Sequence, residues 1–361
     1  MSKHISPDFF LTIEQQQAYS TTLYVHVAFS LCLSAITFYF LLWQTPPNQQ
    51  AIRTHLLMIV LLMAAFDIVT DMLTQPCILL PLPAGYFIGL LNFLPVNIIV
   101  AVLFMTALGI GEATILCFLH KHQTLIDDSS RFKIRPFIYK LYLISCVVAP
   151  IVVLVVGILG DVSNATSDRA MEMYPFKLDW LKERGPYYVK ERNVSNRILS
   201  CVILLVFSFV GLFVLALVWH MLYVLNTLKG SRSVTTRKMI RASVIALSVQ
   251  LVVPAIFQFT PFAIGFIWMA TETGSHQTFR YLYHLFLLYS PLHSIILLAI
   301  TPAYRRAILS FISRFTLIQK VISTAQAARE RLSEPTSQAI RIHPTNLPQN
   351  MTPVIPIAQN L

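Results

Sequence analysis

Long stretches with few or no charged residues recur along the chain and predict its organisation. Each is long enough to cross a bilayer, which takes about 20 apolar residues in a helix. Apolar and polar residues do not alternate in runs such as Val147–Val156, as the strands of a membrane barrel require. We therefore predict helices, which satisfy their own backbone hydrogen bonds in hydrocarbon. The seven predicted spans are Tyr19–Trp43, Thr54–Gln75, Leu91–Leu119, Tyr139–Leu159, Ile198–Leu225, Ala242–Ala270 and Tyr281–Thr301.

Composition supports this reading. Hydrophobic residues make up 56% of the 361 residues and charged residues 12%, whereas soluble domains have about 25% charged residues. Five cysteines in so long a chain exclude a disulfide scaffold. We predict an all-α membrane protein, a seven-transmembrane helix bundle. Its predicted parts are an extracellular N-terminus (1–18), the bundle (19–301), a cytoplasmic amphipathic helix (302–333) and a disordered cytoplasmic tail (334–361).

The distribution of positive charge predicts the orientation. With the N-terminus outside, the inner segments hold 18 of the 27 Lys and Arg residues, and such an excess marks the cytoplasmic side. Two glycosylation sequons, at Asn164 and Asn193, fall in the loop 160–197 that this orientation places outside. The net charge of +11 therefore lies on the inner face, where it suits anionic lipid and acidic protein partners. Nucleic-acid binding has no support.

Three acidic residues lie within the predicted spans, where ionisable groups are costly and often functional. Asp67 and Asp71 are four residues apart and share one helix face. They form a cation site, a proton site or a ligand contact, or else Asp67 belongs to a polar network and Asp71 is hydrated near the surface. Glu112 lies about two turns from the inner end of its helix. We expect it to act as a polar switch that holds the inner helix ends together, with a basic residue such as Arg241.

Further polar residues are candidates for ligand contacts. Asn97, Gln258 and His284 lie in the outer halves of three predicted helices, where together with Asp71 they would orient a small ligand among Phe and Tyr side chains. The alternative is that they only bridge helices. No metal-ligand spacing, nucleophile elbow or phosphate-binding loop occurs. We therefore predict no cofactor, no metal and no enzymatic activity.

Prolines and basic residues mark two further features. Pro95, Pro150, Pro254, Pro261 and Pro291 are predicted to kink the helices, as hinges of a conformational switch. After Pro302, apolar residues at helical spacing predict an amphipathic helix on the inner leaflet. A basic inner rim is predicted to face a cytosolic partner. Its residues are Arg232, Arg237, Lys238, Arg241, Arg305 and Arg306.

Three segments resemble a known family. Gln75–Tyr86 resembles the Pro-rich turn ending in Ala-Gly-Tyr of nematode serpentine chemoreceptors, Leu116–Gln123 resembles the end of their third helix, and Pro302–Arg306 is similar to their Pro-x-Tyr-Arg signature. Class I is the best match and the related class H the second. The resemblance implies a plasma-membrane chemosensory G-protein-coupled receptor, on the cilium of a sensory neuron, that binds a small external ligand and couples to a heterotrimeric G protein α subunit.

The chain also departs from rhodopsin-like receptors. It has no Asp-Arg-Tyr after the third predicted helix, no Asn-Pro-x-x-Tyr in the seventh and no Lys in the seventh that could hold retinal. The loop 160–197 contains no Cys, so a disulfide from this loop to the third helix cannot form. A rival function stays open at this point, a seven-helix transporter or proton-translocating protein that uses the intramembrane acids.

Overall fold

The computed structural model confirms seven membrane-spanning helices. It describes residues 12–45, 50–80, 82–128, 130–159, 164–174, 178–191, 193–227, 234–271, 273 and 276–333. Within these residues, seven helices are long and apolar enough to cross a membrane. They are Ile13–Trp43, Ile52–Thr74, Val96–Leu125, Pro136–Leu159, Arg197–Thr227, Val244–Thr271 and Thr278–Ile300. The chain divides into two compact units, Met1–Ile308 and Leu309–Leu361, and the first contains the bundle.

The first three spans begin and end at clear local signals. Helix α1 (Ile13–Trp43) starts at a capping box, in which Thr12 and Gln15 each accept a hydrogen bond from the other's backbone amide at 3.2 Å. Helix α2 (Gln50–Asp67) continues into a π-helical segment, η3 (Ile68–Thr74). Helix α3 (Val96–Leu125) begins directly after Pro95. Pro95 therefore starts a helix and does not kink one, because its missing amide is not needed there.

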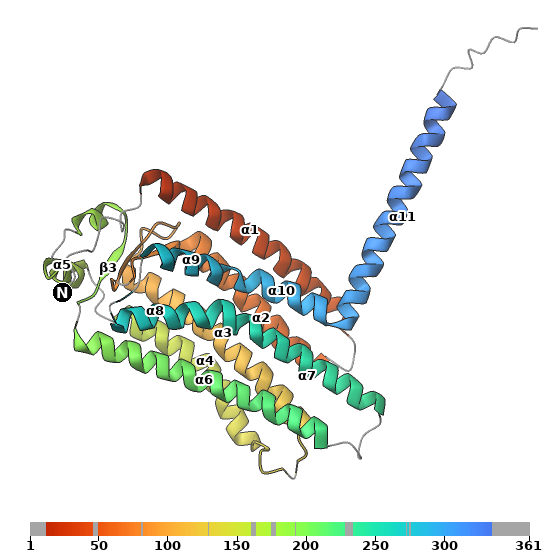
Figure 1. Ribbon diagram of the computed structural model, residues 1–361, viewed down its shortest axis with the longest axis horizontal. Helices are drawn as coiled ribbons and strands as arrows, with labels where there is room; N and C mark the ends of the chain where they lie inside the picture. The colour runs from red at the N-terminus through yellow and green to blue at the C-terminus, as the bar shows by residue number, and fades with distance from the viewer. Residues whose placement is uncertain are drawn as a thin grey trace, which may run out of the picture. The chain divides into compact units, whose positions relative to one another are not determined.

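The remaining helices show where the other prolines act. Pro150 lies inside α4 (Pro136–Leu159). Pro254 ends α7 (Val234–Pro254), after which a π-helical segment, η5 (Ala255–Phe259), leads into α8 (Thr260–Thr271). Pro291 lies in α10 (Tyr289–Ile300), just after a one-residue interruption that separates α10 from α9 (His276–Leu287). Because proline donates no backbone hydrogen bond, the regular helix is interrupted near three of the predicted hinges, Pro254, Pro261 and Pro291. Figure 1 shows these helices with α6 (Val194–Thr227) in one bundle.

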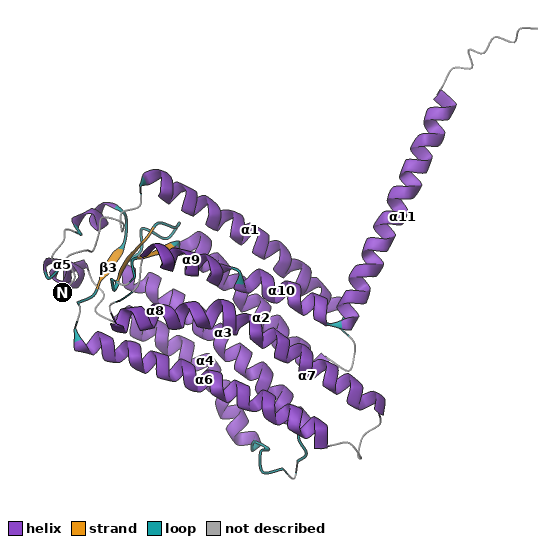
Figure 2. Cartoon of the chain, in the orientation of Figure 1, coloured by secondary structure: helices purple, strands orange, loops and turns teal. Residues whose placement is uncertain are grey.

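A small antiparallel sheet lies at one end of the bundle, and the sequence analysis did not predict it (Figure 2). Its strands are β1 (Pro76–Ile78), β2 (Ala84–Phe87) and β3 (Tyr187–Val189), in the order β1-β2-β3. The first two come from the connection between α2 and α3, and the third from the connection between α4 and α6. We call the three strands, with the β1–β2 turn, the sheet cap. The cap therefore joins two loops that are about 100 residues apart in the sequence.

The cap has its own small hydrophobic core. Leu79, Leu82 and Tyr86 are fully buried there, together with Leu181 of the short helix η4 (Asp179–Glu183). Tyr187 donates a 2.8 Å hydrogen bond to Asp168 of helix α5 (Asn164–Glu172). This bond and the Lys182 ammonium lower the pKa of Asp168, while burial and Asp168 raise the pKa of Tyr187 to about 12. The contact therefore joins a phenol and a carboxylate at neutral pH.

Gly89 lies where the chain turns from the cap back towards the bundle. A substitution there tests how closely the backbone packs at this turn. A methyl group at Gly89 would lie 2.5 Å from the carbonyl oxygen of Leu73 and 2.6 Å from the backbone nitrogen of Thr74. We expect Gly89→Ala to destabilise the protein by about 2 kcal/mol, because backbone atoms cannot move aside as a side chain can. Thermal unfolding in detergent measures the loss. Gly111→Ala is the matched control, since nothing lies within 4 Å of the added methyl group. An unchanged melting temperature for Gly89→Ala would contradict the tight contact.

Candidate functional site

A cavity of about 410 Å³ lies beneath the sheet cap, within the range of about 300–1,000 Å³ for small-molecule sites. The cap and five of the membrane spans contribute to its wall. The lining residues are Phe66, Thr70, Pro76, Ile78, Leu80, Leu82, Pro83, Phe87, Val100, Leu103, Phe104, Ala107, Tyr188, Lys190, Leu199, Ser200, Ile203, Pro261, Phe262, Gly265, Phe266, Met269, Phe279, Tyr283 and Phe286.

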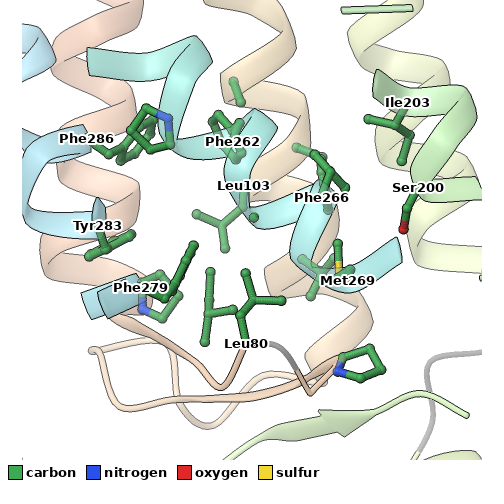
Figure 3. A pocket seen from close by; sticks show the side chains of 18 of the residues that line it. Leu80, Leu103, Ser200, Ile203, Phe262, Phe266, Met269, Phe279, Tyr283 and Phe286 are labelled. Atoms are coloured by element: carbon green, nitrogen blue, oxygen red, sulfur yellow. The ribbon is translucent and has the colours of Figure 1, made fainter. Parts of the chain in front are cut away.

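Aromatic side chains dominate one side of this cavity. In Figure 3, Phe262 of α8 lies between Phe286 of α9 and Phe266 of α8, with Leu103 of α3 near it, around a common space. The rings of Phe262 and Phe286 are 5.1 Å apart between centroids and meet edge to face. Such contacts hold the aromatic side of the cavity in a fixed shape. Leu80 reaches the cavity from the β1–β2 turn, so the cap forms part of the wall.

Few polar groups line the cavity. They are Thr70, Tyr188, Lys190, Ser200 and Tyr283. Thr70 donates its hydroxyl hydrogen to the carbonyl of Phe66 at 2.7 Å, so it is already bonded within its helix. Burial raises the pKa of Tyr188, in the cap, to about 12, and this phenol therefore stays neutral. The hydroxyl of Tyr283 is buried and lies close to the Tyr19 hydroxyl, which donates to the Pro76 carbonyl at 2.8 Å. It makes no hydrogen bond of good geometry with the described residues, so it keeps the capacity for a further hydrogen bond.

Two of the predicted intramembrane acids belong to a buried polar cluster beside the cavity. Nδ1 of His26 lies 2.6 Å from Oδ2 of Asp71. The Ser30 hydroxyl donates to Asp67 and lies 2.9 Å from the Ser290 hydroxyl. The cluster therefore connects α1, the junction of α2 with η3, and α10. Asp71 is 0% exposed, so the interpretation that it is hydrated near the surface is wrong.

None of the four predicted ligand contacts is among the residues that line the cavity. Asp71 lies in the polar cluster. The Asn97 side chain donates to the carbonyl of Ile158 at 2.7 Å and so bridges α3 to α4. His284 is exposed, with Nδ1 2.7 Å from the carbonyl oxygen of Arg280, and Gln258 lies in η5. Bridging describes Asn97 better than ligand contact, and ligand binding by the other three stays a prediction.

Glu112 contacts α4 and not the inner basic residues. Its carboxylate accepts hydrogen bonds from the Tyr142 hydroxyl and the Cys146 thiol, both at 3.3 Å. Arg241, the partner suggested from the sequence, is exposed on α7 and forms no salt bridge with it in the described structure. Glu112 therefore joins α3 to α4, and the expected pairing with Arg241 is wrong. The two helices are adjacent along the chain, and a basic partner on α7 is not needed to hold them.

The end of the bundle opposite the cap contains an imidazole pair that the sequence analysis did not predict. Nε2 of His122, on α3, lies 2.8 Å from Nδ1 of His220, on α6. At the same end, the Tyr304 hydroxyl at the start of α11 (Pro302–Ser333) lies 2.8 Å from the Thr45 hydroxyl. Tyr304 is 1% exposed. These contacts fix the helix ends beside which the predicted basic rim lies.

The predicted rim residues fall on two helices. Arg237, Lys238 and Arg241 lie in the first turns of α7, and Arg305 and Arg306 in the first turns of α11. Arg232 lies outside the described residues. Arg241, Arg305 and Arg306 are exposed. Binding of a cytosolic partner to these residues is not tested by the structure and stays a prediction.

Two of the segments singled out in the sequence have clear structural roles. Gln75–Tyr86 contains β1 and most of β2, and it supplies Pro76, Ile78, Leu80, Leu82 and Pro83 to the cavity wall. At its start Gln75 has a positive φ of 45° and accepts a 2.8 Å hydrogen bond from Ser20. Pro302–Arg306 begins α11 and contains the anchoring Tyr304. The sequence analysis missed the cavity aromatics themselves, although the density of Phe between 257 and 286 was a usable signal.

Comparison with known families gives one match. The model of the family described as serpentine type 7TM GPCR chemoreceptor Srh matches residues 14–314. No curated protein matches the chain. The matched residues include the whole bundle, the cap and the start of α11.

Proposed function

The chain belongs to the serpentine 7TM GPCR chemoreceptor family Srh, and from this premise we propose that it binds a small external ligand beneath the sheet cap and activates a heterotrimeric G protein. The expectation of a serpentine chemoreceptor is confirmed. The match is to Srh, the class H family that the resemblance placed second, and the preference for class I is not confirmed. The protein is a multi-pass membrane protein. Its proposed location is the plasma membrane of a sensory-neuron cilium.

The cavity beneath the cap is the observation that supports the ligand site best. It has the volume of a small-molecule site and is lined by residues of five membrane spans: α2 with η3, α3, α6, α8 and α9. A ligand shifts a receptor between two arrangements only by contacting them unequally. A site that touches five spans at once makes such differences possible, because relative movement of any two of them changes the contacts. The buried Tyr283 hydroxyl, which makes no hydrogen bond of good geometry with the described residues, would orient the ligand.

The orientation completes the proposal. The excess of Lys and Arg in the segments at the opposite end favours the cap end as the extracellular end. The sequons at Asn164 and Asn193 lie in the connection between α4 and α6 that also supplies β3. We infer that both asparagines carry glycans. The opposite end then faces the cytosol, where the basic residues of α7 and α11 would contact the α subunit of the G protein.

Two structural elements are suited to carry the signal inward. The polar cluster of His26, Asp71, Asp67, Ser30 and Ser290 links α1, α2 and α10 near the level of the cavity. Buried hydrogen-bonded groups of this kind have discrete arrangements and resist intermediate ones. The π-helical segments η3 and η5 lie beside the cavity, and π-helical turns are frequent at functional sites. Asp67 is therefore the polar switch residue that we favour.

The rival transporter has less support. A proton path needs a series of ionisable groups across the membrane. The acids here form two separate groups: Asp67 and Asp71 contact α1, and Glu112 contacts α4. Nucleotide exchange on a Gα subunit, evoked by a small molecule in proteoliposomes that contain the purified receptor, tests the proposed function. Proton flux in the same vesicles without any G protein would favour the rival and contradict the proposal.

Neutralising Glu112 tests the resting contact between α3 and α4. We expect Glu112→Gln to raise ligand-free nucleotide exchange by about threefold, which corresponds to ~0.65 kcal/mol in the balance of two states. Tyr142→Phe removes one hydrogen-bond donor to the same carboxylate and should act in the same direction, with a smaller effect. Basal exchange is measured on receptors matched for surface expression. If both variants keep the wild-type basal rate, Glu112 has a packing role and no switching role.

A further inference from the structure

We propose that the ligand enters the cavity sideways from the bilayer, between the cap-proximal halves of α3 and α6, and that it is an uncharged lipophilic molecule. This rests on the function proposed above, because it concerns the same cavity. It adds the route of entry and the chemical class of the ligand.

The cap covers most of the direct route from water, and among its described lining residues only Lys190 is exposed. Leu79 donates a 2.9 Å backbone hydrogen bond to Ala84 across the β1–β2 turn, and Lys190, after β3, donates one of 2.9 Å to Pro83. The Tyr174 hydroxyl donates to the Lys190 carbonyl at 2.7 Å. These bonds connect the strands of both loops above the cavity. The neighbouring Leu80 and Leu82 side chains, 4% and 0% exposed, fill the space below them.

The side wall towards the lipid is thin. Phe104 of α3 and Leu199 of α6 both line the cavity, yet they are 52% and 49% exposed. A side chain that lines a cavity and is also half exposed has no further layer of protein behind it. The cavity therefore reaches close to the lipid-facing surface at these two residues.

Helix α6 packs mainly through its cap-distal half. Among its described side chains, the buried hydrophobic ones are Val214, Leu217, Met221 and Leu225, all in that half. There the imidazole pair of His122 and His220 holds α6 to α3. In the cap-proximal half only Ser200 is buried among the described α6 side chains, and it lines the cavity. The two helices can therefore separate near the cap while their other ends stay in contact.

The neighbouring helix on the other side closes the alternative gap. The Phe207 ring of α6 contacts the rings of Phe259, Phe262 and Phe266, with centroids 5.9, 6.4 and 6.4 Å away. These aromatic contacts fix α6 against η5 and α8. Separation between α6 and α8 would break all three contacts. The boundary between α3 and α6 is the weaker one.

The lining chemistry agrees with a lipophilic ligand. Most of the wall is aromatic or aliphatic, and Lys190 is the one charged residue among the lining residues that the structure describes. Moving a charged ligand into such a largely apolar cavity is unfavourable. An uncharged apolar molecule gains free energy on leaving water, and it first concentrates in the bilayer for the same reason. Entry from the bilayer therefore suits the molecules that the cavity can hold.

Photolabelling tests this route without any G protein. The purified full-length receptor in lipid nanodiscs is exposed briefly to a medium-chain alkyl diazirine, irradiated and mapped by mass spectrometry. We expect labels on the cavity residues Met269 and Tyr283. Leu199→Trp fills the side wall and should slow the appearance of these labels about tenfold, through slower entry. Leu205→Trp is the matched control, since Leu205 is 69% exposed on the same helix and does not line the cavity.

The outcomes separate entry from signalling. Phe104→Trp is a second plug, used if Leu199→Trp lowers the thermal stability of the receptor. If labelling is not slowed in a stable plug variant, sideways entry is overturned. Equal labelling of the cavity by a membrane-impermeant sulfonated diazirine would overturn it too. So would the absence of any labelling of the cavity by the alkyl probe. Plug-sensitive labelling without ligand-evoked nucleotide exchange would support the route and contradict the receptor function. Ligand-evoked nucleotide exchange together with labelling that the plug does not slow would support the receptor function and contradict the route.

Discussion

Gly265→Phe should abolish the response to ligand, lowering the potency of an agonist in nucleotide exchange about 100-fold or more, which is ~2.7 kcal/mol of binding free energy. Gly265 lies in α8, is buried and lines the cavity. A Cβ atom at this position would lie 3.1 Å from a methyl carbon of Leu80 and 3.3 Å from the Phe279 ring. The phenyl group beyond it must occupy the cavity, because the neighbouring space is already filled. Dose–response curves for any molecule that activates the wild type measure the effect.

A matched pair of variants separates blocking of the cavity from damage to the helix bundle. Gly211→Phe makes the same chemical change on α6, where nothing lies within 4 Å of the added Cβ, and it should respond as the wild type does. Ala107→Phe fills the cavity from α3 and should reproduce the loss if Gly265→Phe fails to reach the surface. A normal response from a surface-expressed Ala107→Phe receptor would show that the ligand binds elsewhere.

Reversing the charges of Arg237, Lys238 and Arg241 to Glu should abolish coupling, with ligand-evoked nucleotide exchange at least about tenfold lower. The three residues lie in the first turns of α7, at the end that we assign to the cytosol. Like charges facing each other across an interface cost several kcal/mol, so an acidic surface on the Gα subunit would be repelled. Exchange is measured with purified Gα and compared at equal receptor density.

Two controls guard this result. Replacing the same three residues by Gln removes the charge without reversing it and should give an intermediate loss. Because inner positive charge also sets orientation, an epitope tag at the N-terminus must remain accessible in unpermeabilised cells for every variant. Undiminished exchange in correctly oriented receptors would place the G-protein contact on other residues, and Arg305 and Arg306 of α11 would be the next to change.

The spanning helices could be predicted from the sequence, and the sheet cap could not. A run of 20 or more apolar residues is a long signal with one physical explanation. Strands of three or four residues, such as Tyr187–Val189, are too short to show an alternating pattern. β3 also pairs with a strand about 100 residues earlier, at Gly85 and Tyr188. Such a partner is set by how the helices bring two loops together.

The candidate site, too, could be predicted only in part from the sequence. Sequence analysis looks for polar groups inside helices, so it found Asp67, Asp71 and Glu112, which the structure places in buried or partly buried hydrogen bonds. A cavity lined by Phe, Leu and Met has no such signature, because these residues are equally expected in contact with lipid. Whether Phe262 or Phe209 faces the cavity depends on the packing of α6 against α8. The place of His26 in the polar cluster followed only from the structure, in which its Nδ1 lies 2.6 Å from Oδ2 of Asp71.

The cavity and the polar cluster lie side by side, but no residue of the cluster lines the cavity. The proposed function therefore assigns detection and relay to different side chains on the same scaffold. On that assignment, a duplicated gene could accumulate changes among the aromatic lining residues, and so acquire a new ligand preference, while it keeps the proposed relay. Such an arrangement lets a repertoire of sensors diversify one substitution at a time, with every intermediate still able to report what it binds.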